Sequence, residues 1–401
     1  MAAVIGGRMR LLRATLALAA LASVGGCMGG GFGEGGGPIA QAPAQPANDG
    51  RTIGNGSVKV ALILPMSGQG QGSVAAASMR NAAELAIAEF QNPDLTILVK
   101  DDRGTAEGAR QAAEEAVAEG AELFIGPLFA GSVQAAGQVA KQAGKPVLAF
   151  STDATVASRG VYLLSFLAQE EVDRIIGYAS NQGRRSFAAL VPENTYGNVV
   201  EASFREAAAK RGARVVAMER YAPGQAAAAV QRIAPLIAGP AAQADALFIP
   251  DNAEGLGDVA QALQQAGFDP QRVKPLGTGV WNDPRAFRHA ALQGGWFAAP
   301  DSAGFNAFAN RYRAKVNSDP TRIATLSYDA VSLAAALVRT QGSQRFTDTV
   351  LTNPSGFAGA DGVFRFRPDG TNDRALAVLE LRSGGAAPVS PAPKTLSPSG
   401  T

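Results

Sequence analysis

Val58-Lys59-Val60-Ala61-Leu62-Ile63-Leu64 is a short, largely apolar run that contains several β-branched side chains. Between residues 75 and 90, apolar side chains then recur at the spacing of one helix face. A continuously apolar strand followed by a helix is typical of a parallel sheet that is covered by helices on both faces. This stretch therefore predicts the first strand and the first helix of an α/β fold.

The same alternation continues along the chain. Further strands are predicted at 95–100, 123–125, 146–150, 161–166, 186–191, 215–220, 244–249 and 273–277. Further helices are predicted at 106–119, 132–143, 170–181, 196–210, 226–237 and 256–266. Two α/β units of similar size predict two Rossmann-like lobes with parallel sheets and a ligand cleft between them.

The pattern changes after Gly294. Helices at 304–316 and 324–340 follow one another without an intervening strand. Two apolar runs at 363–366 and 375–381 flank a turn and predict a closing hairpin-like pair. We interpret this last part as a return of the chain to the two lobes.

Composition excludes several classes of function. A chain of 401 residues is too long for a single compact core. Its 36 basic and 34 acidic residues give a net charge of +2, which is no footprint of a nucleic-acid partner. One Cys and one His, His289, exclude a disulfide framework and most zinc or Ser–His–Asp chemistry. We predict no enzyme, no cofactor and no metal site.

The N-terminus is typical of an export signal. Arg8, Arg10 and Arg13 precede an apolar run at 14–24, the order of a secretory signal peptide. The run ends in Val24-Gly25-Gly26-Cys27, which resembles a bacterial lipoprotein signal and implies removal of 1–26 and lipidation of Cys27.

The segments that flank the folded part differ from it in composition. Residues 27–57 are rich in Gly, Pro, Ala and Gln, which predicts a flexible tether behind the lipidated Cys. Residues 383–401 are predicted to be a disordered tail. Met28 after the Cys favours attachment to the outer membrane, at its periplasmic face.

Polar side chains lie in the loops that follow the predicted strands. Ligands of open parallel sheets bind beyond the carboxyl ends of the strands. Strand-end carboxylates could serve acid–base chemistry, but helix capping explains them equally well. For binding a small polar ligand, the candidates are Ser67, Ser132, Ser151, Asp153, Thr155, Tyr196, Asp251 and Trp281.

An ordered set of motifs resembles the periplasmic leucine/isoleucine/valine-binding protein family, the type I solute-binding fold. The motifs are residues 60–68, Asp101-Asp102, Ile125-Gly126-Pro127, residues 144–147, residues 151–155 and Tyr196-Gly197. The resemblance implies an amino-acid-like ligand in a cleft and three hinge crossings near 165–169, 297–303 and 340–350. One lobe would then comprise 58–166 with 300–342, and the other 168–298 with 346–382.

The resemblance also implies roles for particular positions. Thr155 and Tyr196 match positions that contact the ligand in the family. The hydroxyl residue that grips the ligand carboxylate is replaced by Ala130, with Ser132 two places on. The acidic partner of the ligand ammonium falls near Gly279, where Asp251 or Asp283 could substitute.

Asp153 departs from the family pattern, because a small residue usually exposes backbone N–H groups there. A carboxylate at this place would repel an anionic ligand.

Two functions follow from this resemblance. The first is the substrate-binding component of a branched-chain amino acid or amide-type ABC transporter, which passes its ligand to an inner-membrane permease. The second is a penicillin-binding protein activator, an outer-membrane lipoprotein that regulates a peptidoglycan synthase by protein contact. Cys27 and the altered ligand positions fit the second role, and the fold-wide resemblance fits the first.

Overall fold

The computed structural model describes residues 51–91 and 93–396. The predicted signal peptide at 1–26, the predicted lipidation site Cys27 and most of the predicted tether lie outside these residues. Within the described part of the chain, no helix is both long and apolar enough to cross a membrane.

Lobe 1 is built on a sheet with the strand order β1-β3-β2-β4-β5-β6, parallel except for β1. The strands are β1 (Thr52–Gly54), β2 (Val58–Leu64), β3 (Leu95–Asp101), β4 (Leu123–Ile125), β5 (Val147–Ala149) and β6 (Val161–Leu163). Its helices are α1 (Gln71–Glu89), α2 (Ala106–Ala118), α3 (Ala130–Gln142), α8 (Ser302–Val316) and α9 (Ala324–Gln341).

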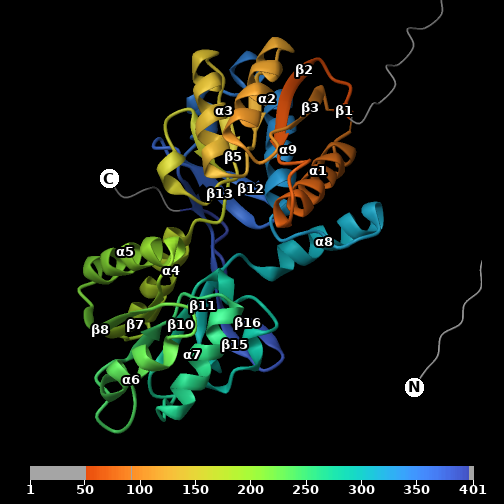
Figure 1. Cartoon of the computed structure of the whole chain (residues 1–401). Coiled ribbons are helices and arrows are strands. Elements are labelled where there is room, and N and C mark those ends of the chain that lie inside the picture. The colour runs from red at the N-terminus through yellow and green to blue at the C-terminus, as the bar shows by residue number, and fades with distance from the viewer. Residues whose placement is uncertain (1–50, 92, 397–401) are drawn as a thin grey trace, which may run out of the picture. The chain divides into compact units, whose positions relative to one another are not determined.

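The opening run of the sequence analysis forms β2 at the centre of this sheet (Figure 1). Val60, Leu62 and Leu64 face a core that they share with α1 and α9. Ala61 and Ile63 face the opposite core, under α2 and α3. Because successive side chains of a strand point to opposite faces, a run that is apolar throughout can fill both cores.

Lobe 2 is built on a sheet with the strand order β16-β15-β11-β10-β9-β7-β8. Strands β7 to β11 are parallel, β15 pairs antiparallel with β11, and β16 pairs antiparallel with β15. The strands are β7 (Ser186–Pro192), β8 (Arg214–Tyr221), β9 (Ala246–Phe248), β10 (Lys274–Gly277), β11 (Trp296–Ala299), β15 (Ala377–Arg382) and β16 (Gly385–Ser390). Its helices are α4 (Ala168–Asn181), α5 (Thr195–Lys210), α6 (Ala226–Ile237) and α7 (Ala253–Gln265).

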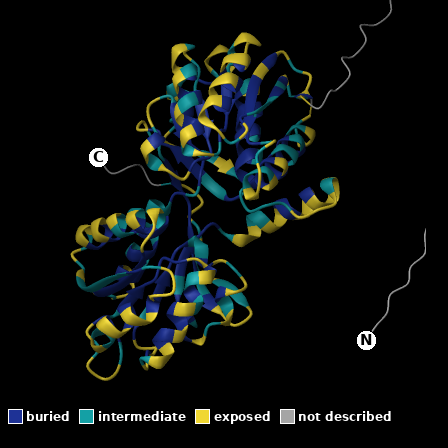
Figure 2. Cartoon of the chain, in the orientation of Figure 1, coloured by how far each residue is buried: buried dark blue, intermediate teal, exposed yellow. Residues whose placement is uncertain are grey.

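In both lobes the sheet is the buried layer. Figure 2 shows the strands largely in dark blue, and the helices carry their exposed residues on the outer side. One face of the second sheet packs against α6 and α7, and the other packs against α4 and α5. The predicted α/β class with parallel-rich sheets in two lobes is therefore confirmed.

The predicted closing hairpin is wrong. Strand β13 (Gly362–Phe366) pairs with β12 (Phe357–Gly359) and β14 (Asn372–Arg374) in a separate antiparallel sheet. The second predicted partner is β15, which pairs with β11 in lobe 2. Strand β14 was missed because Asn372-Asp373-Arg374 is polar throughout and shows no apolar alternation, although all three residues are buried.

The predicted third crossing at 340–350 is also misplaced. Phe346, Leu351, Phe364 and Phe366 belong to the core of lobe 1. The chain enters the second sheet only between β14 and β15, at residues 375–376. An apolar pattern predicts that these side chains are buried, but it does not predict in which lobe.

Both predicted flexible segments contribute an edge strand. Ile53, inside the predicted tether, is buried where β1 pairs with β3. Residues 385–390, inside the predicted tail, form β16 beside β15. Edge strands this short, in sequence rich in Gly, Ala and Pro, lack the alternation that would reveal them.

Candidate functional site

The carboxyl ends of the parallel strands in each lobe hold most of the predicted binding residues. In lobe 1, Ser67 is exposed after β2 and donates its backbone N–H to Asp101 Oδ1 at 3.2 Å. Ser132 is only 1% exposed, and its hydroxyl donates to the carbonyl of Thr105 at 3.3 Å. Ser132 is thus a buried structural hydroxyl in this structure.

Residues 151–155, in the loop after β5, form hydrogen bonds with one another. Asp153 Oδ1 accepts the backbone N–H of Thr155 at 2.9 Å and its hydroxyl at 2.7 Å. The N–H of Asp153 in turn donates to the hydroxyl of the buried Ser151 at 3.1 Å. An internal carboxylate therefore occupies the donors of Thr155 that an anionic ligand would use.

Two adjacent carboxyls follow β3 and differ in environment. Asp102 is fully buried and accepts the N–H of Gly104 at 2.8 Å, and burial raises its pKa. Partial burial alone would raise the pKa of Asp101 as well, but hydrogen bonds from Ser67 and Arg103 hold that pKa below its usual range. Both carboxyls stabilise the loop that leads into α2.

Phe129 is an exposed aromatic side chain at the same edge of lobe 1, just before α3. Its ring is 43% exposed and lies against Gly72 and Gly104. A Cβ atom on Gly72 would come within 2.9 Å of the ring. Sequence reasoning passed over Phe129 because a single apolar residue in a loop carries no pattern.

Lobe 2 places Tyr196 and Asp251 near one another. The Tyr196 hydroxyl lies 2.6 Å from the Thr278 hydroxyl, and burial together with the charge of Glu171 raises the pKa of Tyr196. Asp251 is buried and accepts the Tyr221 hydroxyl at 2.7 Å. Burial raises the pKa of the Asp251 carboxyl.

Glu171, in the first turn of α4, is a member of this group that the sequence analysis missed. Its side chain is 7% exposed, and Oε2 accepts the N–H of Gly279 at 2.9 Å. A Cβ atom on Gly279 would lie 2.6 Å from Glu171 Oε1. Burial raises the pKa of Glu171 to about 7. The sequence held one signal for Glu171: Gly279 stands where the family resemblance implies an acidic residue, and the carboxylate of Glu171 reaches that place from α4.

Trp281 lies in the core of lobe 2. It is fully buried, its indole N–H donates to the carbonyl of Ile249 at 2.9 Å, and its ring packs near Phe297. The structure therefore places Trp281 in the core under α6 and α7, bonded to Ile249 just before the Asp251 loop, and it offers no exposed surface to a ligand.

The two lobes are joined by polar contacts beside the crossings. Arg367 of lobe 1 donates to Glu170 of α4 at 3.0 Å, and burial raises the pKa of Glu170 to about 7. Arg374, at the end of β14, donates to the carbonyl of Ser165 at 3.1 Å. Arg322 makes a bidentate pair with Asp361 at 2.8 and 2.9 Å. The Arg367–Glu170 contact links lobe 1 to the first turn of α4, next to Glu171, and the Arg374 contact holds the chain at Ser165 just before that helix.

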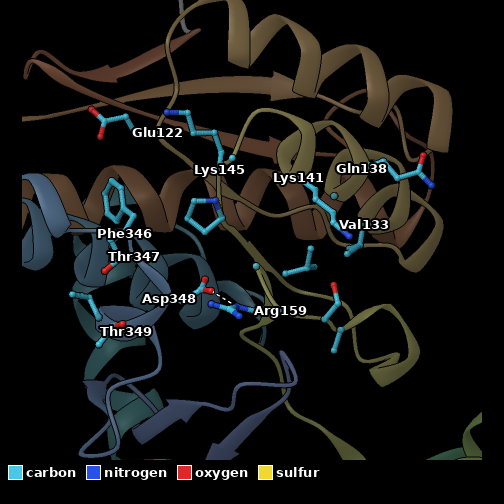
Figure 3. Close-up of a pocket in the computed structure, with 18 of the residues that line it drawn as sticks. Glu122, Val133, Gln138, Lys141, Lys145, Arg159, Phe346, Thr347, Asp348 and Thr349 are labelled. Atoms are coloured by element: carbon cyan, nitrogen blue, oxygen red, sulfur yellow. Dashed lines mark hydrogen bonds and ion pairs between the residues drawn. The ribbon is translucent and has the colours of Figure 1, made fainter.

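A large pocket of about 1350 Å³ lies elsewhere, between α3 and residues 343–350 of lobe 1 (Figure 3). Two ion pairs border it, Arg159 with Asp348 at 2.6 Å and Arg345 with Glu122 at 2.7 Å. Its walls come from α3, the 155–161 loop and the 343–350 segment, so it lies apart from the lobe 2 group. Within residues 51–91 and 93–396, no cluster of acidic, His or Cys side chains could hold a metal ion.

Comparison with known proteins identifies the family. The model described as periplasmic binding protein matches residues 57–386, so the chain belongs to that family. Its lobes have the type I periplasmic binding fold. A comparison with curated proteins finds no match.

Solved structures share this fold. A putative branched-chain amino acid ABC transporter protein from Rhodospirillum rubrum has a TM-score of 0.73 at 20% identity, over 83% of this chain and 99% of the other. A branched-chain amino acid ABC transporter periplasmic ligand-binding protein from Burkholderia xenovorans has a TM-score of 0.67 at 18% identity, over 85% of this chain and 96% of the other. The branched-chain amino acid transporter substrate-binding protein LivJ from Streptococcus pneumoniae, in complex with isoleucine, has a TM-score of 0.59 at 20% identity, over 84% of this chain and 99% of the other.

Proposed function

We propose that this protein is an exported, non-catalytic solute-binding protein that captures a small polar, amino-acid-like ligand between its two lobes. An ABC permease of the inner membrane would receive the ligand. The observation that carries the proposal is the group of Tyr196, Thr278 and Glu171 at the carboxyl edge of lobe 2, in a chain of the periplasmic binding protein family. Solved relatives named as branched-chain amino acid transporter components support the solute class.

The proposed ligand-binding residues follow from exposure and bonding. Tyr196 of lobe 2 has a hydroxyl that can both donate and accept, and Asp251 lies beside it. In lobe 1, Ser67, Asp153 and Thr155 lie in the loops that line the corresponding edge. Ser132 and Ser151 support these loops from beneath.

The proposed location is the periplasmic face of a membrane. The signal at 1–26 would direct export and Cys27 would carry the lipid anchor. Family membership agrees with an exported protein. Met28 supports the outer membrane as the place of attachment.

The proposal is tested by thermal unfolding of the detergent-solubilised full-length protein with a library of amino acids and amides. A ligand present at 100 times its Kd should stabilise the fold by about 2.7 kcal/mol. Tyr196→Ala should remove this shift in a variant that still folds, although the loss of its packing against the lobe 2 core lowers the unfolding temperature of the ligand-free protein. If no member of the library raises the unfolding temperature, solute capture is contradicted.

The alternative is a penicillin-binding protein activator that regulates a peptidoglycan synthase. One observation favours it, namely that Asp153 already occupies both donors of Thr155, so a contact implied for the ligand is used within the protein. The test is capture of purified penicillin-binding proteins by the immobilised full-length chain. Stimulation of the captured synthase, together with failure of every solute, would establish this alternative.

A further inference from the structure

Carboxylates outnumber basic side chains at the carboxyl edges of the two sheets. The basic side chains of these loops are engaged, since Arg103 donates to Gln111 at 3.4 Å and Arg285 pairs with Asp283 at 2.8 Å. The carboxylates are Asp101, Asp102 and Asp153 in lobe 1, and Glu171, Glu193 and Asp251 in lobe 2. The balance of charge at these edges favours a cation over an anion.

Glu171 is a largely buried carboxylate of the lobe 2 group. Its exposed fraction is 7%. Among the described residues, the Gly279 N–H donates a hydrogen bond to its Oε2 atom. The basic group of lobe 1 that acts on it, Arg322, is held by two hydrogen bonds to Asp361. Among the described residues, Oε1 of Glu171 accepts no hydrogen bond, and Arg322 is committed to Asp361. A positively charged ligand would donate to Oε1 and pair with the carboxylate.

Among the described residues of lobe 1, the donors that the family resemblance implies for a ligand carboxylate are already engaged. The Thr155 N–H and hydroxyl both bond Asp153. The Ser132 hydroxyl is buried and donates to Thr105. A ligand carboxylate would therefore meet the Asp153 carboxylate, and like charges at short distance repel each other.

We infer that the ligand is a small organic cation, a primary amine or guanidinium compound without a carboxylate group, whose charged end is bound by Glu171. The Tyr196 hydroxyl lies at the same edge, positioned by the fully buried Thr278, and would accept a remaining N–H donor of the ligand. This inference rests on the proposed solute-binding function. It narrows the ligand from amino-acid-like compounds to their decarboxylated counterparts.

The test uses matched sets of compounds that differ only in their charged groups. The sets are leucine with 3-methylbutylamine and 4-methylpentanoate, arginine with agmatine, and phenylalanine with 2-phenylethylamine. Binding to the full-length protein is measured by calorimetry at pH 8. We expect at least one amine to bind ten or more times tighter than its parent amino acid, and 4-methylpentanoate not to bind.

Variants connect the preference to Glu171. Glu171→Gln should weaken binding of the preferred amine at least tenfold, whereas Glu206→Gln, an exposed position on α5 of the same lobe, should not change it. The ligand-free unfolding temperature of each variant shows whether it folds, and the comparison among compounds needs no variant at all.

The outcomes separate the two proposals. If every amino acid that binds does so as tightly as its amine, the cation inference is overturned and the solute-binding function stands. If neither these compounds nor the wider library bind, the solute-binding function fails and the inference fails with it.

Discussion

The carboxyl edges of the two sheets have the same arrangement of parallel strands but differ in how their polar side chains are hydrogen-bonded. In lobe 1, the polar side chains near the edge bond one another or the backbone, as Asp153 does with Thr155 and Ser132 with Thr105. In lobe 2, Glu171 keeps an unbonded oxygen beside Tyr196 and Thr278. The fold places both edges where a ligand can reach them, but local hydrogen bonding decides which edge retains the capacity to bind.

A glycine accounts for much of the difference. Gly279 has no side chain, so the carboxylate of Glu171 reaches its backbone N–H from a different helix. In lobe 1, Asp153 brings its own carboxylate into the loop and satisfies the neighbouring donors within two residues.

The largest expected effect concerns the pH dependence of folding. The folded-state pKa of Glu171 is about 7, above its ordinary value near 4.5. The folded protein therefore holds this proton more tightly than the unfolded chain. The resulting stabilisation is present below about pH 4.5 and lost as pH rises through 7, by at most about 3 kcal/mol.

Chemical unfolding between pH 5 and 8 measures this effect. Glu171→Gln should flatten the decline in the free energy of unfolding, and Glu206→Gln should leave the decline unchanged. The Arg322 charge acts on Glu171 and lowers its pKa against the effect of burial, while Glu171 and Asp251 act on Tyr196. Parallel pH profiles for wild type and Glu171→Gln would show that Glu171 is not the titrating group.

A matched pair of glycine substitutions compares the two edges directly. Gly279→Ala places a Cβ atom 2.6 Å from Glu171 Oε1, so the carboxylate must leave the Gly279 N–H. We expect a loss of about 2 kcal/mol in the free energy of unfolding. Gly131→Ala in α3 meets open space and should change stability by less than about 1 kcal/mol. Equal losses in urea unfolding would contradict the proposed role of Gly279.

Removing a buried donor in lobe 2 should have a smaller effect. Tyr221→Phe takes away the hydroxyl that donates to buried Asp251 at 2.7 Å. The expected cost is about 1–2 kcal/mol, because a buried acceptor loses its partner. Tyr178→Phe is the control, since the ring of Tyr178 packs edge-on against Trp296 and keeps that contact in the variant. A variant as stable as wild type would mean that water replaces the hydroxyl.

The smallest effect is expected at the exposed loop of lobe 1. Thr155→Val removes the hydroxyl that bonds Asp153 but keeps the backbone N–H bond. We expect a change below about 0.5 kcal/mol in stability, because both side chains are exposed to water. Amine affinity should fall by less than about threefold, because the Thr155 hydroxyl is already bonded to Asp153. A tenfold loss of amine affinity would show that this hydroxyl is a main ligand contact and would contradict the contrast between the edges.

Apolar periodicity carried most of the fold prediction. The predicted strand at 123–125 and the predicted helix at 226–237 match β4 and α6. The failures share one cause, because β1, β14 and β16 are short strands in polar or Gly-rich sequence. Strand β1 pairs with the distant β3, whereas β14 and β16 pair with the strands just before them, β13 and β15. In all three the run is too short, and too polar or Gly-rich, to show an apolar alternation.

The site was less accessible to sequence reasoning. Tyr196 and Asp251 could be proposed because they follow strands, and the structure places them together. Glu171 could not, because it lies in a helix and reaches Gly279 across 108 residues of sequence. Trp281 also follows a strand, but its ring turns into the core.

The sequence by itself determined the alternation of strands and helices, and from it the α/β class with two lobes, because burial on both faces of a strand requires a continuous apolar run. Only the tertiary structure decided that residues 346–366 pack in lobe 1 and that Glu171 occupies the space above Gly279. The physical reason is that periodicity records whether a side chain is buried, whereas its partners depend on segments brought together by folding.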